Sequence, residues 1–207
     1  MEKNRTKVTD MVEIALFAAI IVLLSATPIG YIPLGAINAT TIHIPVILAG
    51  VVLGCKKGAI TGFIFGLTSF VNSSFIKPSV ASFLFTPLMP GGNGYSLVIC
   101  FIPRILIGVV ACLVFKLLVK LVKNKCVSLA VAGVAGSMTN TILVMGMAYF
   151  FFSEKYAKAL EIPVQEVLGY IISVICINGV LEAICAGILT AAIGSVLLVI
   201  QKRRINA

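Results

Sequence analysis

Six long apolar segments, separated by short polar stretches, constrain this chain more than any other feature of its sequence. A helix that crosses a bilayer needs about 20 predominantly apolar residues. Only 11% of the residues are charged, whereas about 25% are charged in an ordinary soluble domain. The sequence therefore predicts one all-α domain over residues 1–207, a multi-pass protein of the cell membrane with six transmembrane helices. The six segments are 11–28, 39–54, 57–73, 96–122, 128–152 and 167–199.

The basic residues predict how these helices are oriented. The net charge is +9, and most of the lysines and arginines fall in four groups, at 3–7, 56–57, 116–125 and 202–204. Lysine and arginine accumulate on the cytoplasmic side of membrane proteins, so both termini are expected to be cytoplasmic. In a soluble protein this charge would suggest nucleic-acid binding. Here topology explains it, and we expect no nucleic-acid partner.

Two ionisable side chains, Arg104 and Glu182, fall inside apolar segments. Charge at that depth is costly, so it usually faces a bundle interior, a partner or a wet cavity. If Pro103 begins the regular helix, Arg104 lies in its first turn. The guanidinium could then bind a carboxylate through two parallel hydrogen bonds. The alternative is a structural ion pair between Arg104 and Glu182, and the sequence leaves both open.

Uncharged polar residues accompany these charges. Asn178 precedes Glu182 by four residues, so the two share one helix face. Asn140 lies at middle depth in the fifth segment. Asparagines at such positions either join helices or line a cavity, and the sequence does not separate these roles.

The second apolar segment opens with further polar residues. Asn38, Thr40 or Thr41 could cap this helix, with Pro45 in its first turn. His43 is the single histidine of the chain and either packs internally or contacts a polar solute. We therefore count Asn38, Thr40 and His43 as candidate binding residues.

The glycines and the cysteines of the chain lead to two structural predictions, one on helix packing and one on the redox state of the thiols. Glycines four residues apart predict that the second and third segments pack tightly as a helical hairpin, too short to span fully. They are Gly50, Gly54, Gly58, Gly62 and Gly66. The six cysteines form no CxxC pair, and we expect them to be reduced, structural thiols.

Two loops on the outer side are expected to close over a ligand. The longer one runs from Asn72 to Tyr95, is rich in proline and glycine, and carries more apolar residues than a solvated loop needs. Long ordered loops are commonly lids or binding loops, so this one should fold back over the bundle together with the loop from Pro28 to Ala39. Asn72 and Tyr95, at its two ends, join the candidate site.

The segments NATTIHIPVILAGVVLGCKKGAITGFIFGLTSF and FIPRILIGVVACLVFKLL resemble the substrate-binding S-components of energy-coupling factor transporters. The resemblance spans nearly the whole chain. It implies a vitamin ligand, a transmembrane coupling subunit and two ATPase subunits. Ala15 and Ala19 match the Ala-xxx-Ala pattern by which the first helix docks on the coupling subunit. The pantothenate-type branch is the most similar.

The expected function is therefore vitamin capture, with pantothenate as the expected ligand, whose carboxylate would meet Arg104. Its hydroxyls and amide would meet Asn38, His43, Asn140 or Asn178. Alternatives are another vitamin (riboflavin, folate or a thiamine precursor), a stand-alone secondary carrier, or a membrane assembly factor without ligand. One histidine, no transmembrane aspartate and no GxxxxGK[ST] loop argue against an enzyme, so no catalytic residue, metal or cofactor is expected.

Overall fold

The computed structural model is mostly helical. Among the residues that it describes, five helices are long and apolar enough to cross a membrane: Val8–Ala26, Cys55–Ile76, Gly94–Leu121, Lys125–Leu160 and Val164–Gln201. The described residues are 2–34, 37–79 and 81–205, with the backbone alone described for 2–7, 29, 31–34, 37–39 and 202–205.

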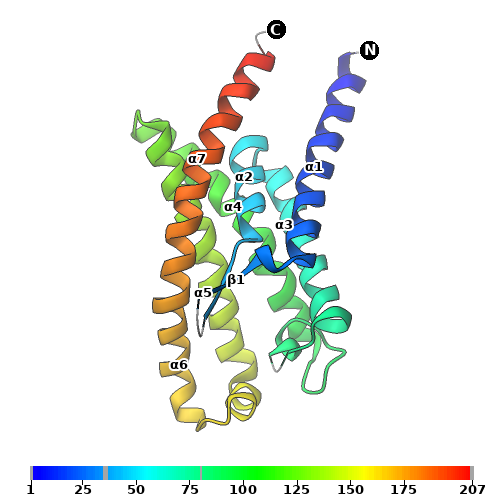
Figure 1. Ribbon diagram of the computed structural model, residues 1–207, viewed down its shortest axis with the longest axis vertical. Helices are drawn as coiled ribbons and strands as arrows, with labels where there is room; N and C mark the ends of the chain where they lie inside the picture. Colours follow the sequence, from blue (N-terminus) through cyan, green and yellow to red (C-terminus); the bar gives the residue numbers. More distant parts are fainter. Residues whose placement is uncertain (1, 35–36, 80, 206–207) are drawn as a thin grey trace.

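The helices form one bundle, with both termini at the same end (Figure 1). The central pair, α4 and α5, packs against α3 on one side and α7 on the other. The helices are α1 (Glu2–Ala26), α2 (His43–Leu53), α3 (Cys55–Val71), α4 (Gly94–Leu121), α5 (Lys125–Leu160), α6 (Val167–Val174) and α7 (Val180–Ile205).

The predicted second spanning helix is replaced by a half-helix and a β-hairpin. The helix α2 has only 11 residues, a length of about 16 Å. Before it, β1 (Tyr31–Leu34) and β2 (Ile37–Thr40) pair antiparallel, with Asn38 opposite Pro33. The expected N-cap role of Asn38, Thr40 or Thr41 was wrong, because Ile42 occupies the N-cap position and no side chain caps the helix.

Close packing of the glycine hairpin is confirmed, and the structure adds Gly108 of α4 as its partner. The expectation that both helices of the hairpin are too short to span was wrong for the second, because Cys55–Ile76 is long enough to cross a membrane. A methyl group on Gly50 would lie 2.2 Å from the Gly108 carbonyl oxygen, and one on Gly108 would lie 2.4 Å from that of Gly58. Only backbone without side chains fits there. Gly54 differs from the others, since it adopts a φ of +99° in the α2–α3 turn and packs on nothing.

This close approach brings two cysteines together. Cys55 begins α3, Cys112 lies one turn beyond Gly108, and their Cα atoms are 5.2 Å apart. They form a disulfide, so the expectation that all six cysteines are reduced was wrong for this pair. No sequence pattern indicated this pair, because the two residues are 57 positions apart.

Two helices contain π-helical turns. The first, η2 (Asn72–Ile76), continues α3, and the second, η5 (Ile175–Gly179), joins α6 to α7. Such turns shift side chains relative to the regular helix and are frequent at functional sites. A third irregularity is the kink in α5 at Phe152, where the fifth helix was predicted to end. The helix instead continues to Leu160.

The long outer loop folds back over the bundle, as predicted. It contains the short 3-10 helix η3 (Ser82–Leu84), whose Phe83 and Leu84 are buried in a core cluster with Ile99. The Ser96 hydroxyl of α4 donates a hydrogen bond to the Phe83 carbonyl at 2.6 Å. The loop is therefore a packed part of the bundle. Two further 3-10 turns are η1 (Pro28–Gly30) and η4 (Val164–Glu166).

Candidate ligand-binding site

A cavity of about 270 Å³ lies beside β2, enclosed by α3, α4, α5 and the α6–α7 segment. Its lining combines polar groups with aromatic and aliphatic surface, which is typical of small-molecule sites. The lining residues are Thr40, Phe65, Ser69, Ser73, Phe85, Arg104, Asn140, Thr141, Val144, Met145, Val174, Asn178 and Glu182.

Arg104 reaches this cavity from the interior of α4. The prediction that Pro103 begins the helix was wrong, because Asn93 and Ser96 form a capping box that starts α4 at Gly94. Pro103 has no N–H, so the carbonyl four residues earlier, that of Ile99, lacks its usual helical donor. Nη1 of Arg104 donates to this carbonyl at 2.8 Å. The guanidinium is thereby fixed at the wall of the cavity.

Two aromatic rings lie against the same guanidinium. Its central carbon is 4.6 Å from the centroid of the Phe85 ring and 5.6 Å from that of Phe65. Cations at such distances are attracted by the ring faces. Phe85 belongs to the long outer loop, so this loop supplies part of the cavity wall.

Glu182 supplies the opposite charge from α7. The carboxylate accepts a hydrogen bond from the Thr40 backbone N–H at 2.7 Å and one from the Thr141 hydroxyl at 3.4 Å. Its side chain is buried, with 9% exposure. None of the salt bridges between described residues joins Glu182 to Arg104. The two charges therefore line the same cavity without a salt bridge between them.

The two predicted asparagines also line the cavity. Oδ1 of Asn140 is buried, and no other described residue forms a hydrogen bond with it. Asn178 lies in the π-helical turn η5, and Ser73 lies in the other π-helical turn, η2. Both irregular turns thus bring polar side chains to the same cavity.

Three predicted residues whose side chains are described, His43, Asn72 and Tyr95, are not among those lining this cavity. The Asn38 side chain lies outside the described residues. His43 is buried, and no described residue bonds its ring nitrogens. The Asn72 amide donates to the Ser25 carbonyl and hydroxyl, which ties η2 to α1. The Tyr95 ring stacks on Phe151, with centroids 4.5 Å apart.

Some lining residues carried a signal that the sequence reasoning missed. Ser69 and Ser73 are four residues apart at the end of an apolar segment, and Thr141 directly follows Asn140. Phe65 and Phe85 carried no such signal, because an apolar residue in a membrane segment is ordinarily a packing residue. Only the fold shows that they face a cation.

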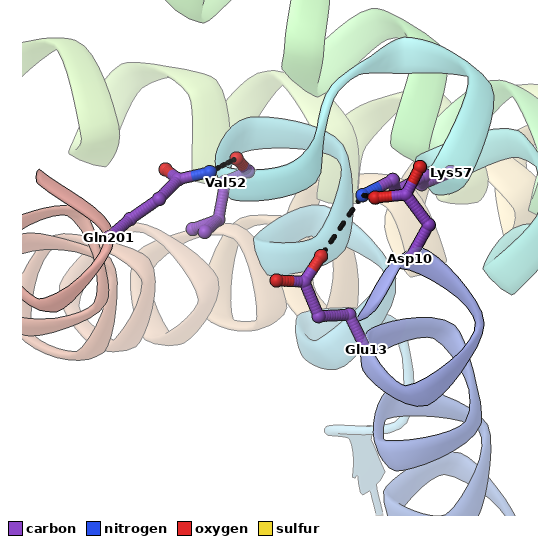
Figure 2. A network of polar contacts seen from close by, with 5 residues as sticks. All are labelled: Asp10, Glu13, Val52, Lys57 and Gln201. Atoms are coloured by element: carbon purple, nitrogen blue, oxygen red, sulfur yellow. Dashed lines mark hydrogen bonds and ion pairs between the residues drawn. The ribbon is translucent and has the colours of Figure 1, made fainter. Parts of the chain in front are cut away.

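A separate polar network lies at the end of the bundle that holds the termini (Figure 2). The ammonium group of Lys57 bonds Asp10 at 2.6 Å and Glu13 at 3.0 Å, which joins α1 to α3. The Gln201 amide of α7 donates to the Val52 carbonyl of α2 at 3.1 Å. Both terminal helices are thus fastened to the α2–α3 hairpin.

The remaining predicted residues, Ala15 and Ala19, are both exposed on α1. Around them this helix presents much apolar surface: Val12 and Leu16 are each 62% exposed. This face is open to lipid or to another membrane protein.

Comparison with known proteins places these features in context. The family model "ECF transporter, substrate-specific component" matches residues 9–194. The pantothenic acid transporter PanT of Lactococcus lactis subsp. cremoris is 34% identical over 198 residues, covering 92% of this chain and 94% of its own. The pantothenate transporter PanT of Leuconostoc mesenteroides is 32% identical, covering 98% of each chain.

The fold also has a counterpart of known structure. The crystal structure of the S-component for biotin from an ECF-type ABC transporter superposes with a TM-score of 0.55. The match covers 92% of this chain and 93% of that chain, at 20% sequence identity.

Proposed function

The chain belongs to the family of substrate-specific components of ECF transporters, and from this premise we propose that it captures pantothenate for import. Two relatives named as pantothenate transporters, each more than 30% identical over nearly the full length, support this ligand. As a member of this family the chain is an integral membrane protein and not an enzyme.

The observation that carries the proposal is the division of charge within the cavity. Arg104, fixed by Ile99 and flanked by two rings, supplies a cationic donor for a carboxylate. Glu182 and Asn140 supply acceptors for hydroxyl and amide protons. Pantothenate carries a carboxylate at one end, hydroxyls at the other and an amide between them.

The size of the cavity supports a small vitamin over the alternatives. Its volume of about 270 Å³ is near the lower end of the range for ligand pockets, roughly 300–1,000 Å³. Riboflavin and folate are larger, with extended ring systems. We therefore rank pantothenate above them.

We further propose six membrane crossings with both termini in the cytoplasm. The common position of the termini in Figure 1 supports an even number of crossings. The half-helix α2 and the β-hairpin together would make the second crossing. The positions of the basic groups support a cytoplasmic location for the end that carries the termini.

The proposed partners are a transmembrane coupling subunit and two ATPase subunits. The exposed Ala15 and Ala19 on α1 would meet the coupling subunit, because small side chains allow helices to approach closely. The β-hairpin and the outer loop would act as the lid, and pantothenate should slow backbone hydrogen exchange in both.

Binding to the purified chain tests the ligand. Isothermal titration of detergent-solubilised protein should show saturable binding of pantothenate and none of riboflavin, folate or a thiamine precursor. Binding of one of these vitamins in place of pantothenate would overturn the ligand assignment. Pantothenate uptake into proteoliposomes that hold the chain alone, without ATP, would instead favour a stand-alone carrier.

A further inference from the structure

We propose that Glu182 makes this cavity select a ligand with a free hydroxyl end and reject one whose hydroxyl end is phosphorylated. The inference rests on the proposed function and deepens it. It assigns each end of the ligand to a charge of the cavity.

The surroundings of Glu182 are rich in acceptors. A carboxylate accepts hydrogen bonds at about four lone-pair positions, and the donors to Glu182 are the backbone N–H and the side chain of Thr40 and the Thr141 hydroxyl. Oδ1 of Asn140 is a further buried acceptor without a partner among the described residues. A ligand group that docks here must bring protons, as hydroxyl or amide groups do.

The one cation among the residues that line the cavity is held by groups other than Glu182. Among the lining residues Arg104 alone is basic. Its Nη1 is bonded to the Ile99 carbonyl, and its guanidinium is packed by Phe85. It is not in ion-pair contact with Glu182 within the described structure.

A phosphate in place of the hydroxyl would put two negative groups together in a buried site. Like charges interact more strongly there than in water, and such juxtaposition is strongly unfavourable. A ligand carboxylate at that end would be repelled by the Glu182 carboxylate for the same reason. The ligand therefore binds in one orientation, with its carboxylate toward Arg104 and its hydroxyls toward Glu182.

The test compares pantothenate with 4′-phosphopantothenate by isothermal titration of the purified full chain. The wild type should bind the phosphorylated compound more weakly by roughly 100-fold or more. In Glu182→Gln this ratio should fall by about 10-fold or more, because the amide carries no charge. Glu13→Gln, which removes a carboxylate bonded to Lys57 on α1, is the matched control and should keep the wild-type ratio.

The outcomes separate this inference from the proposed function. A wild type that binds no pantothenate contradicts both. A wild type that binds both compounds equally overturns only the role of Glu182, and this comparison needs no variant to fold. An unchanged ratio in a folded Glu182→Gln protein also overturns it.

Discussion

Arg104 donates to the carbonyl of Ile99, the one backbone acceptor in α4 that Pro103 deprives of its helical donor. The proline therefore creates a binding position for the neighbouring side chain. A guanidinium held in this way loses less freedom when a ligand binds, and such preorganisation strengthens binding.

Replacing Arg104 by lysine tests the anion site. Lysine keeps the charge but lacks the planar fork that binds a carboxylate at two points. Losing a charge-assisted hydrogen bond costs about 1.5–3 kcal/mol, so pantothenate affinity should fall about 10- to 150-fold. Titration of Arg104→Lys checks this, with Lys116→Arg, an exchange at an exposed site, as the control. Unchanged affinity in a stably folded variant would assign Arg104 a purely structural role.

Replacing Pro103 by alanine tests its role, because alanine restores the missing backbone N–H at this position. The Ile99 carbonyl would then accept its ordinary helical bond, and Arg104 would lose an exclusive acceptor. Pantothenate affinity should fall about 5-fold, the equivalent of one hydrogen bond worth about 1 kcal/mol, while the melting temperature is unchanged or higher. Pro163→Ala, at an exposed loop position, should alter neither quantity. A Pro103→Ala protein with wild-type affinity contradicts the positioning role.

The contact between Gly58 and Gly108 predicts a large difference between two glycine substitutions. In Gly108→Ala the new methyl group would meet the Gly58 carbonyl at 2.4 Å, whereas Gly146 has no atom within 4 Å of that position. Overpacking of this kind costs roughly 1–3 kcal/mol or more. Gly108→Ala should lower the melting temperature in detergent, and Gly146→Ala should leave it unchanged or raise it. Equal melting temperatures would show that α3 and α4 can separate without cost.

Substitutions on α1 test whether this helix docks on a coupling subunit. Tryptophan at Ala15 or Ala19 should abolish ATP-dependent uptake in proteoliposomes and leave pantothenate binding by the isolated chain intact, because a bulky side chain separates the two helices. Ala192→Trp, on the exposed face of α7, is the matched control. Uptake that survives both α1 substitutions would place the docking face elsewhere.

The disulfide predicts how many thiols react with a maleimide. In unreduced, denatured protein four cysteines should be modified: Cys100, Cys126, Cys176 and Cys185. After reduction all six should react, as counted by intact-mass spectrometry. Crosslinks over loops of this size contribute about 2–4 kcal/mol, so Cys112→Ser should also melt at a lower temperature. Six reactive thiols before reduction would contradict the bond.

Residues whose burial is costly could be predicted from the sequence more reliably than residues that act through their backbone groups. Arg104, Glu182, Asn140 and Asn178 stood out because polar groups in apolar segments need a reason, and all four line the cavity. Thr40 was chosen for its hydroxyl as a helix cap, whereas in the structure its backbone N–H and its side chain both bond Glu182. Backbone groups are the same at every position, so no residue pattern marks them.

The fold, like the candidate site, could be predicted from the sequence only in part. Hydrophobic length located the long helices, and the glycine spacing located the tight hairpin. Length did not show that the first residues of the second segment belong to a β-hairpin, because Asn38 and Thr40 are equally compatible with the start of a helix. The π-helical turns at Asn72–Ile76 and Ile175–Gly179 were also unpredictable, since their side-chain shifts depend on neighbouring helices.

The bond between Thr40 and Glu182 has a consequence for how the protein is made. Strand backbone at membrane depth is tolerated only when it is sheltered by protein or water, and this partner lies 142 residues further along the chain. When the ribosome has finished the β-hairpin, α7 has not yet been synthesised. The hydrogen bond between Thr40 and Glu182 can therefore form only after α7 has been made. The half-helix α2, with 11 residues, is much shorter than the roughly 20 residues of a spanning helix.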